Sequence, residues 1–455
     1  MTGRSEPTRA SREDTMEDAA RGTNRREFLT AAGVGAAGAL AFGGLASGRL
    51  GELVSNARAA TTNLALAATD GYITVPGRED DPIYIFGFIP VSNSLTVSQL
   101  EDQYKGHAQH TAPTLNFLQN DDIKITLTNL GLIQRPDLTD SHTIHWHGFD
   151  IPSPLNDGVP EVSVAVPIGQ QLTYFYRPHR EGTYMYHCHF EDVEHVQMGM
   201  TGIVFVRPLQ DNNATLRNVG TTRRPGAPAF KGFGYNDGDA STGYDRHFAI
   251  LLNEIWAKQH DGDRDIQETI PTDFDPDWFT LNGRCFPETL RPNNDPTLTT
   301  PNPTTGTDDH SQPNSALIQL NPGDRALLRL ANLGYTTDSM ELPGISMHVV
   351  GQDASLLRDG SVDTSYVTDT IYMGPGEARD VLFDAPAFDA ALPTGSDGRG
   401  AYNVYQFKNR DWRKLSNGGA AGPGGMQTEV RVYRGDTLQG DLPLPAQNVV
   451  SETYV

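Results

Sequence analysis

The chain has 455 residues, of which 37% are hydrophobic and 20% charged, and it contains 46 Gly and 30 Pro. This composition suffices for two or three hydrophobic cores and suits many short strands joined by turns, which argues against a mostly helical protein. The formal net charge of −22 argues against nucleic acid or an anionic membrane as a partner, because both would be repelled. With only Cys188 and Cys285, the chain has no disulfide framework, and Cys285 is most simply a small buried apolar residue.

Residues 1–59 are typical of an export signal. Arg25 and Arg26 precede an uncharged, Ala- and Gly-rich run from Thr30 to Gly48, which is the pattern of a Tat signal. Ala57-Arg58-Ala59 supplies small residues at the spacing of a cleavage site. Because the run is weakly apolar and barely long enough to cross a bilayer, we predict Tat export to the extracellular space or cell envelope, without a membrane span.

The rest of the chain contains an internal repeat. Residues 114–131 (TLNFLQNDDIKITLTNLG) match residues 317–334 (LIQLNPGDRALLRLANLG) at an offset of 203. Ile123, Ile125 and Leu127 alternate with Lys124 and Thr126, as in a strand with one buried face. We therefore predict an all-β chain of two β-sandwich domains, residues 60–208 and 245–440. Residues 209–244 would be the linker, 291–314 a long loop in the second domain, and 441–455 a C-terminal tail.

Two short segments of the first domain concentrate histidines. HTIHWHG begins at His142, and YHCHFEDVEHVQMGM ends at Met200. One thiolate, two imidazoles and a distant thioether are the ligand set of a blue copper centre, and this set is matched by His142, Cys188, His195 and Met200. The spacing Cys-x6-His-x4-Met would place three of these ligands on one loop between two strands.

The remaining histidines of these segments form two His-x-His pairs. Alternation along a strand directs the two members of each pair to one face, so the pairs predict a second metal site at His145, His147, His187 and His189. Zinc is the alternative metal, but structural zinc sites favour several thiolates and catalytic zinc sites rarely need eight ligands. We therefore predict copper as the cofactor.

These motifs, together with NDGVP at residues 156–160 and GTYMYHCH, resemble the multicopper oxidase family, which includes laccases and is related to the copper nitrite reductases. The resemblance implies two cupredoxin-like Greek-key domains, with type 1 copper on His142, Cys188, His195 and Met200. It further implies a type 2 role for His145 and type 3 roles for His147, His187 and His189. Electrons from a small-molecule or metal-ion reductant would enter singly at type 1 copper and pass through Cys188 and the adjacent His187 and His189 to a site that reduces oxygen.

The sequence departs from the family pattern in two places. The segment between His189 and His195 is two residues longer than usual. At the offset of 203, HTIHWHG becomes ISMHVVG, which leaves His348 as the counterpart of His145, and the HCH segment aligns with Tyr405, Gln406 and Phe407. Since the second repeat lacks most ligands, we expect about two coppers per chain rather than four. The resemblance to two-domain members implies a homotrimer in which His348 completes the second site of a neighbouring chain.

Two alternative functions stay open at this point. One is a copper nitrite reductase-like enzyme, although His145 stands where that class usually has an acid. The other is a non-enzymatic copper protein for electron transfer or storage, although such a carrier would not need the two His-x-His pairs.

Overall fold

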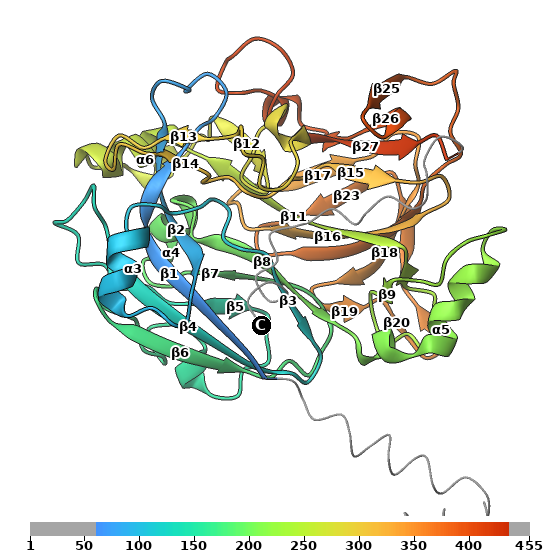
Figure 1. The fold of residues 1–455 in the computed structure, drawn as a ribbon, viewed down its shortest axis with the longest axis horizontal. Helices are drawn as coiled ribbons and strands as arrows, with labels where there is room; N and C mark the ends of the chain where they lie inside the picture. Colours follow the sequence, from blue (N-terminus) through green and yellow to red (C-terminus); the bar gives the residue numbers. More distant parts are fainter. Residues whose placement is uncertain (1–60, 436–455) are drawn as a thin grey trace, which may run out of the picture. The chain divides into compact units, whose positions relative to one another are not determined.

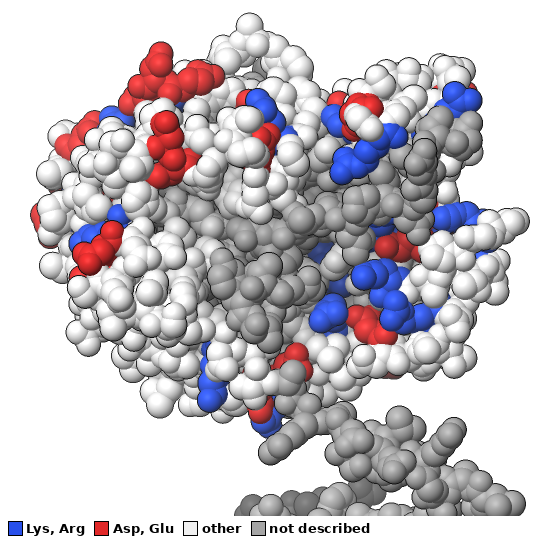
Figure 2. Space-filling view, in the orientation of Figure 1, with Lys and Arg blue, Asp and Glu red and all other residues white. Residues whose placement is uncertain are grey.

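The computed structural model describes residues 61–435. The predicted export signal and the predicted C-terminal tail lie outside the described residues. Within residues 61–435, no helix has the length and apolar character that crossing a membrane would require. On the face drawn in Figure 2, Lys and Arg side chains are interspersed with Asp and Glu and form no continuous basic surface.

Two four-stranded sheets form the first β-sandwich (Figure 1). One has the order β2 (Ile83–Val91), β1 (Thr61–Ile73), β4 (Asp122–Gly131), β6 (Gln171–Tyr176). The other has the order β3 (Leu115–Leu118), β8 (Thr201–Arg207), β7 (Gly182–His187), β5 (His145–His147). Along β4, the buried Ile123, Ile125 and Leu127 alternate with exposed Lys124 and half-buried Thr126, as the sequence pattern predicts.

The second β-sandwich is built in the same way. Its larger sheet contains β12 (Trp278–Leu281), β11 (Arg246–Ile255), β16 (Arg325–Asn332), β24 (Ala378–Asp384), β18 (Met347–Gln352) and β19 (Ser355–Leu356), with β22 (Tyr366–Thr368) paired to β18. The facing sheet contains β15 (Ile318–Leu320), β27 (Gln427–Tyr433), β26 (Gly400–Asn409), β17 (Asp338–Glu341) and β23 (Thr370–Met373), with β25 (Thr394–Asp397) paired to β26. Each sandwich encloses its own apolar core.

The strand pairing confirms the internal repeat. The parallel pair β1–β4 of the first domain corresponds to the parallel pair β11–β16 of the second. In the facing sheets, the parallel pair β3–β8 corresponds to β15–β27. The fold is therefore all-β with two sandwich domains, as predicted.

Short elements surround this framework. The α-helices within residues 61–435 are α3 (Val97–Tyr104), α4 (Asp192–Gln197), α5 (Ala214–Asn218) and α6 (Ala257–Asp265). The predicted linker, residues 209–244, contains α5, the 3-10 turns η2 (Leu209–Asn212) and η3 (Val219–Thr222), and a ribbon of β9 (Gly232–Phe233) with β10 (Gly243–Tyr244). The predicted loop 291–314 contains a ribbon of β13 (Thr300–Pro301) with β14 (Asp308–Asp309). A third ribbon joins β20 (Arg358–Asp359) to β21 (Val362–Asp363). The exact domain boundaries stay predictions.

A buried interface fixes β7 against the second domain. Met185 and Phe205 pack with Leu251 and Ala331 of the second domain in one apolar cluster. Thr183 donates a hydrogen bond of 2.6 Å to Asp380, whose carboxylate also lies 3.4 Å from the buried Arg329. Because β7 leads directly into His187 and Cys188, this interface positions the segment on which the predicted copper ligands lie.

Candidate functional site

The four predicted type 1 ligands come from the ends of neighbouring strands. His142 precedes β5 and is held by paired backbone hydrogen bonds with Val166, 3.1 and 2.8 Å long. Cys188 follows β7, His195 lies on α4, and Met200 precedes β8. The Cys188 N–H donates to the Met200 carbonyl over 3.1 Å, and the Met200 N–H donates to the His195 carbonyl over 2.9 Å. These bonds fold the segment 188–200 back on itself and bring its three predicted ligands together.

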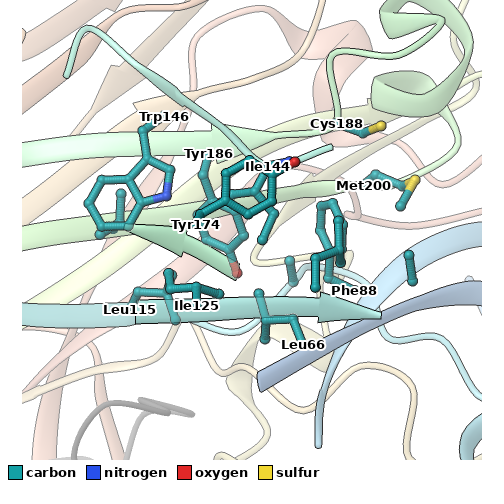
Figure 3. Close-up of a cluster of buried hydrophobic side chains, with 14 of the residues drawn as sticks. Leu66, Phe88, Leu115, Ile125, Ile144, Trp146, Tyr174, Tyr186, Cys188 and Met200 are labelled. Carbon is teal, nitrogen blue, oxygen red and sulfur yellow. The ribbon is translucent and has the colours of Figure 1, made fainter. Parts of the chain in front are cut away.

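The side chains of three of these residues converge. The Nδ1 atoms of His142 and His195 lie 3.8 and 3.3 Å from the Cys188 sulfur. All three residues are at most 1% exposed. Met200 is also fully buried, and Figure 3 shows Cys188 and Met200 at the same end of the core. Three of the four predicted ligands therefore converge, and the fourth, Met200, is buried in the same core cluster as Cys188.

Burial and charge set the protonation of this group. Burial lowers the pKa of His142 well below its usual value. Burial works in the same direction on His195, but the Cys188 thiolate and Asp140 outweigh it and raise the pKa of His195 to about 10. The Thr143 N–H points at the Cys188 sulfur over 3.4 Å. A metal ion bound here would displace the proton of His195.

This donor set fits copper. Two imidazole nitrogens and one cysteine sulfur lie within 4.8 Å of one another in a buried group, and the Met200 thioether belongs to the same core cluster as Cys188. Blue copper sites use this combination of donors. A structural zinc site would instead call for a fourth strong ligand, which the thioether of Met200 does not supply.

The other four motif histidines form a second group on β5 and β7. His145 lies directly opposite His187 across the strand pair. The ring of His145 lies 5.3 Å from that of His187, 5.0 Å from that of His189 and 6.2 Å from that of His147, centroid to centroid. His187 is buried, His145 and His189 are half-buried, and His147 is exposed. The group therefore opens toward the protein surface.

Hydrogen bonds orient two of these rings. His145 Nδ1 lies 2.7 Å from the Asp157 carbonyl, and His187 Nδ1 lies 2.8 Å from the Cys188 carbonyl. Each Nδ1 must carry the proton to donate to a carbonyl, so each Nε2 keeps its lone pair for a metal. Burial lowers the pKa of His145 and His147, and lowers that of His187 to about 3. The three rings are therefore neutral at pH 7, as metal binding requires.

The NDGVP motif fixes β5 from outside. Gly158 has φ of +77°, and a Cβ added there would lie 2.2 Å from the Ile144 carbonyl oxygen. The Asn156 side chain accepts the Phe175 N–H over 2.8 Å, which ties the motif to β6. Glycine is required at residue 158 because the loop passes directly over the strand that carries His145.

The alignment that assigned His348 as the counterpart of His145 is wrong. β5 pairs with β7, whereas β18, which carries His348, pairs with β22 and β24 in the other sheet of its domain. The His348 Nε2 lies 2.9 Å from the Ser365 hydroxyl, in a pocket shared with Thr242, Arg358 and Asp363. Among the described residues, the His348 ring contacts no other histidine ring. Phe407, aligned with His189, is instead a core residue.

Two acidic residues beside the first group were missed from the sequence. Ligand atoms of Asp140, Glu191 and His195 all lie within 4.8 Å of one another. The Asp140 carboxylate lies 3.7 Å from His195 Nε2, the ring nitrogen that points away from Cys188. Their positions, two residues before His142 and four before His195, are a signal that could have indicated them.

Comparisons with known proteins show to which family the chain is similar. Residues 104–211 and 246–391 both match the multicopper oxidase family. Laccase-1 of Emericella nidulans is 29% identical over 107 residues, which cover 23% of this chain and 16% of that protein. The chain therefore matches only a small part of this curated relative.

Two solved structures share the fold. The multicopper oxidase mgLAC superimposes with a TM-score of 0.55 and 21% identity, covering 85% of this chain and 88% of that one. A blue copper oxidase from Nitrosomonas europaea also gives a TM-score of 0.55, with 20% identity over 84% of this chain and 92% of that one. The two sandwiches are thus cupredoxin-like, and copper is the cofactor that the family implies. The chain belongs to the multicopper oxidase family.

Proposed function

We propose that the protein is an exported copper oxidoreductase that takes single electrons from a reductant and delivers them to oxygen. His142, Cys188, His195 and Met200 would hold type 1 copper, and His145, His147, His187 and His189 would hold the second copper site. When bound, copper would supply one-electron transfer at the type 1 site and oxygen reduction at the second copper site. The observation that carries the proposal is the convergence of both histidine groups on one strand end, at His187 and Cys188.

The chain itself supplies the electron path. Cys188 is covalently joined to His187 and His189, so the two groups are linked by a few bonds, and His187 also bonds the Cys188 carbonyl. Reductants would approach the Nε2 side of His195, because Glu191 is exposed there and Asp140 is half-buried. These carboxylates favour a cationic reductant by electrostatic attraction. The buried Nδ1 side of the ring keeps water from the thiolate.

The decisive experiment loads the purified protein with copper and compares two cysteine variants. We expect blue protein and steady oxygen uptake with a phenol or Fe²⁺ as reductant. Cys188→Ser should lose the colour and the uptake, because a hydroxyl lacks the thiolate charge transfer to Cu(II). Cys285→Ser is the matched control and should keep both, since Cys285 is a buried core residue of another cluster. Blue colour in Cys188→Ser would refute the type 1 assignment.

The acceptor separates the proposal from its alternatives. Reduction of the blue centre without oxygen uptake would indicate an electron carrier, and turnover with nitrite in the absence of oxygen would indicate a nitrite reductase-like enzyme. Under the proposal, oxygen uptake should be proportional to the reductant oxidised.

We further propose that the protein assembles head to tail as a homotrimer. Exposed apolar side chains on two segments support this: Leu155, Val162, Val164 and Ile168 on the first, and Val362, Tyr366 and Val367 on the second. The first adjoins Asp157, which bonds His145, and the second adjoins His348, which pairs with Val367. Burying one of these segments against the other would cover the open histidine group and bring the His348 pocket toward it.

Sedimentation and a His348→Ala variant test the assembly. We expect trimers, with loss of second-site copper in His348→Ala if this residue reaches a neighbouring chain's site. Monomers only, with unchanged copper content in His348→Ala, would contradict the assembly. Export is tested separately by locating the protein after replacement of Arg25 and Arg26 by Lys.

A further inference from the structure

Matching hydrogen bonds identify the second-domain residues that correspond to the predicted type 1 ligands of the first domain. The strand pair β17–β26 corresponds to β5–β7, with Glu341 opposite Lys408 as His145 is opposite His187. One residue later, the Asn409 N–H donates to the Met426 carbonyl over 3.0 Å. The Cys188 N–H makes the same bond to Met200 over 3.1 Å. Asn409 thus corresponds to Cys188, and Met426 to Met200.

Two more matched bonds locate the remaining positions. The Met426 N–H donates to the Lys414 carbonyl over 2.8 Å, as the Met200 N–H donates to that of His195 over 2.9 Å. Asn332 donates to the Thr336 carbonyl over 2.9 Å, as Asn129 donates to that of Asp140 over 2.8 Å. Asp338 lies two residues after Thr336, and His142 lies two residues after Asp140. The counterparts of His195 and His142 are therefore Lys414 and Asp338.

These four second-domain side chains make one buried group. Lys414 Nζ lies 2.6 Å from the Asp338 carboxylate, and Asn409 Nδ2 donates to that carboxylate over 2.7 Å. Asn409 Nδ2 also lies 3.4 Å from the Met426 sulfur. Asp338 and Met426 are at most 1% exposed, and Lys414 is 4% exposed.

We propose that the second domain keeps a type 1 copper scaffold in which the Lys414 ammonium takes the place of the metal ion. The inference rests on the proposed type 1 site of the first domain. A buried carboxylate needs a compensating cation, and burial raises the pKa of Asp338 while Lys414 opposes that rise. The Lys414 ammonium supplies this cation, so the second-domain site binds no copper.

Charged side chains also replace the second histidine group. In the same register, Glu341 corresponds to His145, Lys408 to His187 and Arg410 to His189. Lys408 and Arg410 lie 3.7 and 3.5 Å from the Glu341 carboxylate, as an ion-pair cluster. Side-chain cations thus stand at both second-domain sites that correspond to the metal ligands of the first domain, and neither of these two sites should bind copper.

The test restores the ligands. In a Cys188→Ser background, which has no first-domain thiolate, we would introduce Asp338→His, Asn409→Cys and Lys414→His, leaving Met426 as the thioether. Copper should then produce an intense visible thiolate-to-Cu(II) band and add one ion per chain. The matched control carries Cys188→Ser, Asp338→His and Lys414→His with Asn409 kept, and should stay colourless. Cys285 is present in both proteins and cannot cause the difference.

A folded restored variant, judged by circular dichroism, that stays colourless and takes up no extra copper would overturn the inference. Should that variant not fold, Lys414→Ala provides a second test. Methylammonium should enter the space left by the side chain and raise the Tm of Lys414→Ala, on the order of 2–4 °C, but not that of Lys408→Ala. Equal shifts in both variants would overturn the inference.

The outcomes also separate this inference from the proposed function. If the wild-type protein is not blue with copper, the proposed function fails. If it is blue and the second-domain tests fail, only this inference is lost.

Discussion

Replacing Lys414 by Met removes a buried cation and leaves Asp338 without its ion-pair partner. The Lys414 ammonium donates to Asp338 over 2.6 Å, to the Thr336 hydroxyl over 2.7 Å and to the Thr337 carbonyl over 2.8 Å. Both charged side chains are at most 5% exposed, so solvent screening does not reduce their interaction. Methionine retains the apolar stem, so the loss is mainly electrostatic. Breaking one side of a buried pair costs about 3–5 kcal/mol, and we expect that loss in the free energy of unfolding at pH 8.

The stability lost in Lys414→Met should increase with pH. In the variant, burial without the ammonium holds the pKa of folded Asp338 above its unfolded value. A carboxyl group whose pKa is raised on folding makes its full contribution to the free energy of unfolding below its unfolded pKa, near 3.9, and this contribution is lost as the pH rises through the folded pKa. The difference between wild type and Lys414→Met should therefore be small near pH 4 and largest at pH 8.

The assay is urea unfolding of the copper-free chains, followed by tryptophan fluorescence at both pH values. Trp256, Trp278 and Trp412 report on the second domain. The double variant Asp338→Asn, Lys414→Met should recover more than half of the loss, because no buried charge is left unpaired. A loss below about 1 kcal/mol at pH 8, or the same loss at both pH values, would refute the reasoning.

Three further outcomes are expected. Copper-saturated protein should hold about two ions per chain by metal analysis, and four tightly held ions would contradict the ligand count. Gly158→Ala should lose second-site copper and keep the blue band, because the new Cβ would lie 2.2 Å from the Ile144 carbonyl oxygen and would push the adjoining β5 out of position. Unchanged copper content in this variant would contradict the prediction. Glu191→Gln should lower kcat/KM for Fe²⁺ about tenfold but not for a neutral phenol, whereas the neighbouring Asp192→Asn should change neither. Equal losses for both reductants would show that Glu191 acts on the copper site instead.

The grouping of the first-domain histidines with Cys188 could be predicted from the sequence because these candidate ligands lie in two short segments. Strand alternation within HTIHWHG and YHCH decides which side chains share a face, and no long-range information is needed to pair them. The lengthened segment before His195 folds into α4, yet His195 Nδ1 still reaches the Cys188 sulfur. Asp140 and Glu191 were missed because their approach to His195 depends on how α4 folds back, although both lie within four residues of a motif histidine.

The second-domain site could not be predicted because a single offset does not hold along the repeat. The offset of 203 is correct for β4 and β16, but the segment between Gly334 and Asp338 is seven residues shorter than that between Gly131 and His142. The true counterpart of HTIHWHG is therefore DSMELPG, at an offset of 196. It shares only its final glycine, Gly344, whose φ of +90° matches the +78° of Gly148. With the ligands replaced, only the hydrogen-bond register identifies the pair.

The second domain holds the helix that carries His195. The Tyr335 hydroxyl donates to the Val193 carbonyl over 2.8 Å, and Gln197 donates to the Glu254 carbonyl over 2.9 Å. α4 has only six residues and no side-chain hydrogen bond at its N-cap, so it has little stability of its own. These contacts from the second domain therefore fix the orientation of the His195 ring. The second sandwich thus positions a predicted ligand of the first domain, and its own buried ion pair between Lys414 and Asp338 needs no metal ion.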